Sequence, residues 1–200
     1  MEIRSNSPNT CWEKTMDYLL EYGKENILYQ REYLMATNIT YVLDRVEEEK
    51  LHDKYLISDM YKRSYSNSFG INNTGIELKR IYQYGKSKVN QYELAKEAIL
   101  SNDSYRVPVI MVQYPEEDYQ TDGYPKCLLD IHFIRDNDKI SAVCNYLSSN
   151  MAIFNLIDIY LLHNIHAKMA EDTNYKIGEL VIHFDRVFIW KLDLLMYRRL

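Results

Sequence analysis

The stretch Tyr124–Asn150, YPKCLLDIHFIRDNDKISAVCNYLSSN, decides the fold of this 200-residue chain. Two apolar, β-rich runs, KCLLDIHFI and KISAVCNYL, flank the polar sequence RDND, and this pattern predicts two antiparallel strands joined by a hairpin turn. The first run carries Cys127 at the beginning of its strand. A lone cysteine in a strand is usually a small core residue, so the rest of the chain must decide whether Cys127 is a nucleophile.

Helices and further strands surround this hairpin along the sequence. TMDYLLEYGKE has apolar residues at helical spacing and ends at Gly23, a residue typical of helix C-caps. Helical spacing also occurs in QYELAKEAILSN and NLIDIYLLHNIHAKMAED, and DRVEEEK suggests a solvated helix face. KYLISDMYKRSY is compatible with a helix, and SNSFGINNTG with a loop. The β-rich segments are NITYVLDRV, VPVIMVQY, IGELVIHF and RVFIWKL. Pro108 lacks an N–H, so VPVIMVQY fits a strand start or a sheet edge. The mixture predicts an α+β fold.

Composition narrows the class of protein. A chain of 200 residues with 46% hydrophobic and 26% charged residues predicts one globular domain over residues 1–200. The net charge of −5 argues against nucleic acid as a partner, because phosphate binding needs basic patches. No apolar run approaches the roughly 20 residues of a membrane span, and the N-terminus lacks a signal-peptide core. We therefore expect a cytoplasmic protein without a membrane partner. The odd number of cysteines, with no CxxC pair, argues against a disulfide framework or structural zinc.

Four short signatures, in this order, resemble the thymidylate synthase and deoxycytidylate hydroxymethylase family: YQYG, LSNDSYR, YPKCLLDIHF and GELVIHFDRVFIW. The resemblance covers about residues 81–192, runs without gaps from Cys127 to the long helix, and is closest to the hydroxymethylase branch in RDNDKISAVCNYLSSN. It implies a three-layer thymidylate synthase-like fold with a mixed, largely antiparallel twisted sheet. It also implies a homodimer, and the apolar strands of the hairpin agree with a sheet that is covered on both faces.

The resemblance implies one-carbon transfer to C5 of a pyrimidine. Cys127 matches the nucleophile that adds to C6, and Tyr84 matches a tyrosine that orders proton-relay water. The one-carbon donor would be 5,10-methylenetetrahydrofolate, and no metal is implied. Asp158 lies 31 positions after Cys127 (158 − 127), where synthases have an asparagine and hydroxymethylases an aspartate. A carboxylate there accepts from the exocyclic amine of cytosine, so a cytosine-type base is expected.

Several implied substrate-binding positions depart from the family pattern. The resemblance assigns the substrate-binding role to Asp158, Ser148, Arg106, His132, Asn150 and Trp190. The phosphate-binding Arg-Ser pair reads Leu147–Ser148, and leucine cannot replace a guanidinium. Of the paired arginines lent across the dimer, only Arg106 remains. The His-x-Tyr that holds the sugar reads Phe188 and Trp190. These losses favour an unphosphorylated nucleoside, another pyrimidine-like ring, or a catalytically degenerate protein.

Two hypotheses follow. The first is a C5 hydroxymethyl or methyl transferase acting on a pyrimidine nucleotide or nucleoside. The second is a degenerate protein of the same fold with a binding or assembly role. An accessible Cys127 thiol favours the first, and a thiol buried under neighbouring side chains favours the second.

For folate, Asp59 is the one weak match to an early family acid, and the sequence ends at LLMYRRL, where synthases continue into a segment that closes over folate. His163 and His166, three residues apart, fit a polar helix stripe better than a metal site.

Overall fold

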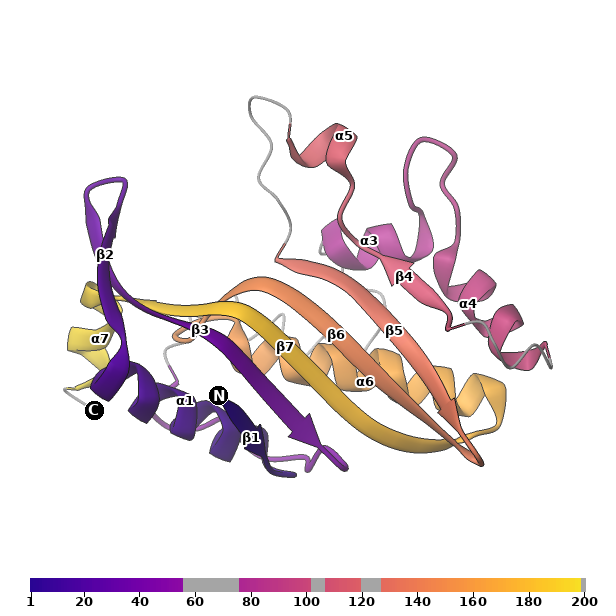
Figure 1. Ribbon diagram of the computed structural model, residues 1–200, viewed down its shortest axis with the longest axis horizontal. Helices are drawn as coiled ribbons and strands as arrows, with labels where there is room; N and C mark the ends of the chain where they lie inside the picture. The colour runs from indigo at the N-terminus through magenta and orange to yellow at the C-terminus, as the bar shows by residue number, and fades with distance from the viewer. Residues whose placement is uncertain (56–75, 102–106, 120–126, 199–200) are drawn as a thin grey trace.

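The computed structural model of the protein describes residues 1–55, 76–101, 107–119 and 127–198. At its centre is a seven-stranded sheet in the order β1-β3-β7-β6-β5-β4, with β2 paired to β3 as well (Figure 1). The strands are β1 (Glu2–Arg4), β2 (Lys24–Leu28), β3 (Arg31–Leu43), β4 (Val109–Met111), β5 (Leu128–Asp136), β6 (Lys139–Asn150) and β7 (Lys176–Trp190). The helices are α1 (Pro8–Tyr22), α3 (Ile76–Tyr82), α4 (Gln91–Leu100), α5 (Pro115–Asp118), α6 (Asn155–Thr173) and α7 (Lys191–Tyr197).

The sheet is mixed and largely antiparallel. The pairs β2–β3, β3–β7, β4–β5 and β5–β6 are antiparallel, whereas β1–β3 and β6–β7 are parallel. The parallel pair β6–β7 requires a crossover, which α6 supplies. The predicted fold class, α+β with a sheet of this kind, is confirmed.

The predicted hairpin forms between β5 and β6. Its strands pair from Leu128↔Tyr146 to Asp136↔Lys139. Asn137 in the turn has φ 53°, a left-handed conformation that asparagine tolerates better than most residues. The apolar inward-facing residues Ile131 and Phe133 of β5 and Ile140, Ala142 and Cys144 of β6 are at most 1% exposed, so Cys144 is a core residue.

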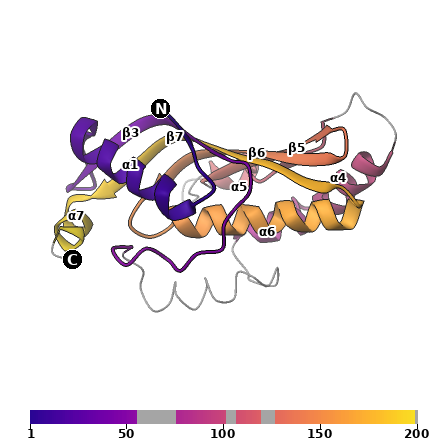
Figure 2. The same ribbon diagram turned by 90° about the horizontal axis from the view of Figure 1, so that it is seen from below.

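Helices α1 and α6 cover one face of the sheet, and Figure 2 shows both on the same side. The predicted C-cap of α1 is confirmed. The N–H of Gly23 donates to the carbonyl of Leu19 at 2.9 Å, and a Cβ at position 23 would lie 2.3 Å from that oxygen. Glycine is therefore required for this close approach of two backbone segments. Helix α1 begins earlier than the quoted helical segment, because the Ser7 hydroxyl accepts from the N–H of Thr10 and caps it at Pro8.

The histidines of α6, His163 and His166, have a structural role in packing the helix. The Nε2–H of His166 donates to the carbonyl of Ile140 on β6 at 2.7 Å, and the side chain is 1% exposed. Burial lowers the pKa of His166 to about 4, so its ring is neutral near neutral pH. Burial also lowers the pKa of His163. Among the described residues, no group of three or more His, Cys, Asp or Glu side chains is arranged to hold a metal ion.

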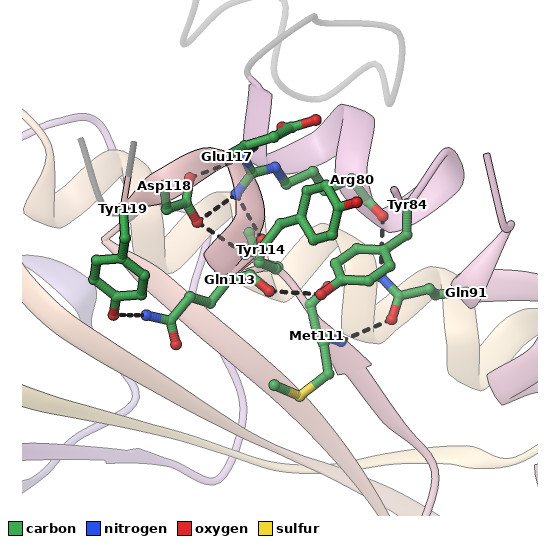
Figure 3. Close-up of polar contacts among 10 residues, drawn as sticks. Arg80, Tyr84, Gln91, Met111, Gln113, Tyr114, Glu117, Asp118 and Tyr119 are labelled. Atoms are coloured by element: carbon green, nitrogen blue, oxygen red, sulfur yellow. Dashed lines mark hydrogen bonds and ion pairs between the residues drawn. The ribbon is translucent and has the colours of Figure 1, made fainter. Parts of the chain in front are cut away.

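Helices α3, α4 and α5 lie beside β4, the last strand of the sheet (Figures 1 and 3). The Arg80 guanidinium makes a two-pronged ion pair with Asp118, at 2.7 and 2.9 Å, in a buried position. The side-chain amide of Gln91 donates to the carbonyl of Met111 at 2.6 Å and accepts from its N–H at 3.0 Å. These contacts fix α3, α4 and α5 to the edge of the sheet.

The helix expected at DRVEEEK, residues 44–50, does not form. These residues run as bends and irregular chain, because Glu49 is used elsewhere. Its carboxylate accepts from the Ser7 hydroxyl at 2.9 Å and from the Asn9 N–H at 3.2 Å, at the start of α1. The loop expected at SNSFGINNTG, and the helix expected at KYLISDMYKRSY apart from Lys54 and Tyr55, lie outside the described residues. In the described ranges, none of the helices has the length and apolarity that a membrane span needs.

Candidate functional site

The sheet departs from regular alternation at one level of β3 and β7. Each strand exposes two consecutive residues there, Thr37–Asn38 in β3 and Asp185–Arg186 in β7, whereas a regular strand exposes every second one. Asn38 has φ 56°, in the left-handed region. The buried positions of β7 consequently change phase, from Leu180, Ile182 and Phe184 to Val187 and Ile189. We call this level the bend.

One row of paired residues crosses the bend. Arg186 pairs with Thr37 on one side and with Ser148 on the other. Residues that pair across neighbouring strands project from the same face of a sheet. We call Thr37, Arg186 and Ser148 the bend row.

Cys127 lies at the end of the bend row. Its carbonyl accepts from the N–H of Leu147 at 2.8 Å, and its Sγ lies 3.7 Å from the Oγ of Ser148. Cys127 is exposed, whereas Cys11 and Cys144 are 0% exposed. Burial raises the pKa of Cys11 to about 12 and raises that of Cys144 as well, so neither forms a thiolate near neutral pH. Of the three cysteines, Cys127 alone has a solvent-accessible thiol.

Asp158 reaches the same strand end through Ser149. The hydroxyl of Ser149 donates to the Asp158 carboxylate at 3.2 Å and accepts from the Asn155 amide at 3.4 Å. Asn155 in turn accepts from the Tyr41 hydroxyl at 3.1 Å, and Tyr41 contacts Thr15 at 2.8 Å. A buried polar chain therefore leads from the core to a half-buried carboxylate on the first turn of α6. Because Ser148 and Ser149 are consecutive, the contacts of Cys127 and Asp158 fall on neighbouring residues.

Tyr84 is linked to the start of β5 through Gln113. Its hydroxyl donates to the carbonyl of Gln113 at 2.7 Å, and its ring lies 5.3 Å from that of Tyr114 (Figure 3). The N–H of Gln113 donates to the carbonyl of Leu129, two residues after Cys127. Burial raises the pKa of Tyr84, so its phenol stays protonated. With its proton directed at Gln113, the hydroxyl can only accept from a water molecule.

Asn150 and Trp190, two other predicted site residues, lie beyond the bend at the ends of β6 and β7. The Asn150 side chain accepts from the N–H of Ala152 at 2.9 Å and closes the turn before α6. Asn150 pairs with Phe188, whose ring lies 5.6 Å from that of Trp190. Tyr33 packs against both rings, at 6.0 and 5.4 Å. Trp190 is therefore part of an aromatic cluster next to the bend.

His132 is not brought to Cys127. It lies five residues further along β5 (132 − 127), roughly 16 Å away along an extended strand. Its Nε2 lies 3.1 Å from the carboxylate of Asp130. Arg106, and also Asp59, lie outside the described residues.

Ser149, Asn155 and Arg186 were missed by the sequence analysis. Serine and asparagine carry no signal in an isolated sequence that distinguishes a link to a carboxylate from an ordinary helix cap. Arg186 sits in a β-rich run, and its nearness to Ser148 depends on the register of a parallel pair formed by strands 26 residues apart (176 − 150). The available signal was the adjacent polar pair Asp185–Arg186, which interrupts the alternation of β7.

Comparison with known proteins identifies the fold. No protein-family model and no curated protein matches the chain. Among solved structures, thermostable thymidylate synthase A from Bacillus subtilis matches with a TM-score of 0.72 and 13% sequence identity. The match covers 96% of this chain and 84% of that one. The chain therefore has a thymidylate synthase-like fold, and the fold is all that a likeness at this identity establishes.

Proposed function

We propose that the protein transfers a one-carbon unit, hydroxymethyl or methyl, to C5 of a pyrimidine nucleotide or nucleoside with a cytosine-type base. One observation carries the proposal: in a thymidylate synthase-like fold, the single accessible thiol, Cys127, lies at a bend of the sheet beside Ser148. A core cysteine would be buried like Cys11 and Cys144. The position suits a nucleophile that must reach a bound ring.

The first step needs only the thiolate and the ring. The sulfur of Cys127 forms a bond to C6, and the electron pair of the C5–C6 double bond moves onto the ring carbonyl and N3. The nucleophilic C5 then takes a proton from water or attacks an electrophilic one-carbon unit. In the exchange reaction, loss of the original C5 proton restores the double bond as the C6–S bond breaks, and the thiolate is released. In the transfer reaction, the C5 proton would be lost and the donor would leave from the new carbon. Water would then add to that carbon for a hydroxymethyl product, or the donor would supply a hydride for a methyl product, and the C6–S bond would break to release the thiolate.

Asp158 is proposed to select the base. Its carboxylate is half-buried on the first turn of α6 and accepts from the Ser149 hydroxyl at 3.2 Å. A carboxylate accepts from the exocyclic amine of cytosine but meets only an acceptor oxygen at position 4 of uracil. Cytosine-type substrates should therefore bind better than uracil-type ones. Tyr84 is assigned the ordering of proton-relay water, as an acceptor.

The proposed one-carbon donor is 5,10-methylenetetrahydrofolate, which would supply an electrophilic carbon. We assign it no binding residues. Trp12, which could offer a flat surface to a ring, is 1% exposed, and its N–H donates to the Met151 carbonyl. The other tryptophan, Trp190, packs edge-on against Tyr33 and Phe188. Exchange of the C5 hydrogen, unlike transfer of the one-carbon unit, requires no folate.

A second copy of the chain is the proposed partner. Along β5, β6 and β7, alternate residues project away from the helix-covered face and are only half-buried, among them Asp130, Val143, Asn145, Val181 and His183. Helices α1 and α6 both lie on the opposite side of the sheet (Figure 2). We propose that two such faces pack together in a homodimer. Sedimentation equilibrium should then give twice the chain mass of 23.9 kDa.

Exchange of the C5 hydrogen tests the proposed function without a folate. The protein is incubated in deuterated buffer with dCMP, dUMP, deoxycytidine or deoxyuridine, and loss of the C5 proton signal is followed by NMR. Cys127→Ala should abolish the exchange, whereas Cys144→Ala, which removes a thiol from the core, should keep it. Asp158→Asn should shift the preference from cytosine to uracil.

The outcome of this experiment separates the two hypotheses. Exchange that depends on Cys127 supports the transferase. Absence of exchange with all four compounds, from a protein that is folded by circular dichroism, would instead leave the binding or assembly role.

A further inference from the structure

Strand β5 carries one extra residue close to Cys127. The ladder between β5 and β6 shifts its register between Leu128 and Asp130. Leu129 is therefore the extra residue of a β-bulge, a feature that bends a strand and re-aims the side chains beside it. The bulge lies two residues after the thiol, so it can set the direction in which that thiol points.

The bulge decides which face of the sheet Cys127 occupies. Leu128 and Ile131 are both 1% exposed and belong to the core, although they are three positions apart (131 − 128). A regular strand brings side chains to the same face at every second position, so it would turn Leu129 and Cys127 inward together with Ile131. The extra residue places Leu128 inward instead, and Cys127 is exposed. The accessibility of the thiol therefore depends on the bulge.

A register without the bulge is a close competitor, because leucine stands at both positions. Moving Leu129 into the inward place of Leu128 would bury the same kind of side chain. The apolar area buried then hardly distinguishes the two registers, although a shift by one residue reverses the faces. The preference for the observed register must therefore come from contacts that are specific to the bulge.

Two backbone N–H groups hold the bulge from the β4 side. Val112 and Gln113 both donate to the carbonyl of Leu129, at 2.8 and 3.2 Å. Arg80 fixes the first of these donors, because its guanidinium donates to the carbonyl of Val112 at 3.0 Å. The two backbone groups of Val112 thus connect Arg80 to the bulge beside Cys127.

Asp118 holds the chain that follows Val112. Arg80 binds the Asp118 carboxylate through two N–H groups, at 2.7 and 2.9 Å, and the same carboxylate accepts from the N–H of Tyr114 at 2.8 Å (Figure 3). Arg80 and Asp118 are 5% and 2% exposed. A buried ion pair adds little net stability, because taking two charges out of water offsets most of their attraction. We call Arg80, Val112 and Asp118 the clasp.

We infer that Arg80 is a positioning residue for Cys127: the clasp holds the bulge at Leu129, and the bulge keeps the thiol on the accessible face of the sheet. The inference rests on the proposed function, in which this thiol is the nucleophile. Arg80 selects one register of β5 from two that bury equal apolar area. Without the clasp, the regular register gains population and turns the thiol inward.

A double substitution removes the clasp without leaving a buried charge. In the variant with Arg80→Met and Asp118→Leu, apolar side chains of similar size replace the ion pair, a change that is often neutral for stability. Arg135→Met is the matched control. Arg135 also donates to two backbone carbonyls, those of Ile99 and Ser101, but it lies near the opposite end of β5 from Cys127.

Alkylation by iodoacetamide measures the accessibility of the Cys127 thiol. Cys11 and Cys144 are 0% exposed, so the native protein is modified at Cys127. The double variant should react about tenfold more slowly than the wild type, the result of a regular register that holds roughly nine tenths of the population. Arg135→Met should react at the wild-type rate. An unchanged or faster rate in a double variant that is folded by urea denaturation would overturn the inference, as would equal slowing in Arg135→Met.

Arg80→Lys separates the clasp from the ion pair alone. Lysine keeps a positive charge beside Asp118 but lacks the planar fork that reaches this carboxylate and the Val112 carbonyl together. Its alkylation rate should therefore fall between those of the wild type and the double variant. A wild-type rate in Arg80→Lys would assign the effect to charge alone and overturn the role of the Val112 contact.

The two proposals fail in different ways. If alkylation slows in the double variant but the wild type catalyses no C5 exchange, the clasp stands and the transferase does not. If C5 exchange depends on Cys127 and proceeds equally in the wild type and the double variant, with equal alkylation, the transferase stands and the clasp does not.

Discussion

Two rows of the same sheet, four residues apart on β3 and β7, differ in almost every physical respect. The core row, Tyr41, Ile182, Cys144 and Ile131, crosses four strands, and each member is at most 1% exposed. The bend row, Thr37, Arg186 and Ser148, has two exposed members and one buried hydroxyl. Regular alternation buries apolar groups and supplies stability, whereas the break in alternation allows polar groups to gather beside a thiol.

The largest expected effect is on the free energy of unfolding. It is tested by replacing a phenylalanine with alanine on either side of the bend, at Phe184 and at Phe188. Phe184→Ala should lower the free energy of unfolding by about 4 kcal/mol, because Phe184 is fully buried against Tyr41 and Tyr146. Phe188→Ala, in the half-buried aromatic cluster, should cost about 2 kcal/mol. Urea denaturation measures both. Equal losses would mean that the bend is packed as tightly as the core, against the contrast drawn above.

Lowering the pH should decrease the stability of the protein through His166, which packs against the regularly alternating part of the sheet at Ile140. Its folded pKa, about 4, lies below the unfolded value of about 6.5, so between these values the unfolded state binds the extra proton. Stability therefore falls as the pH decreases from 6.5 to 4, by on the order of 3 kcal/mol from this group. His166→Gln should show a correspondingly shallower loss in urea denaturation over that range. A variant with an unchanged pH profile would show that carboxylates alone account for the acid response.

The smallest effect concerns the backbone of the bend. Asn38 has φ 56°, which costs a residue with a Cβ and no local hydrogen-bonding side chain about 1 kcal/mol. Asn38→Ala should therefore destabilise the protein by about 1 kcal/mol in thermal or urea unfolding. Asn38→Gly should change stability by no more than about 0.5 kcal/mol. If alanine were tolerated as well as glycine, the left-handed conformation would not be needed there.

The regular region was predictable from sequence because its signals are local. Alternation identified the β5–β6 hairpin, and helical spacing identified α6. The prediction of a helix at DRVEEEK was wrong, because Glu49 accepts a hydrogen bond from the Asn9 N–H at the start of α1. These two residues are forty positions apart (49 − 9), and charge patterning along the chain does not reveal such a distant partner.

The bend was less predictable because it is a property of three strands together. IGELVIHF and RVFIWKL were both identified as β, and they are one strand, β7, joined through the exposed pair Asp185–Arg186. Cys127, Ser148 and Asp158 came from the family resemblance, and the structure brings them to one strand end. Arg186 became visible only through register, since nothing in its neighbours along the chain indicates Ser148.

The amide of Gln91 has a consequence for contacts between molecules. An outermost strand ordinarily offers free N–H and C=O groups on which a foreign strand can grow, the first event in domain swapping and fibril formation. At Met111 of β4 both groups are already bonded to Gln91. Growth there would first have to displace an intramolecular partner. On the opposite border, β2 exposes Ile27 and Leu28, so strand addition between copies should begin at that side.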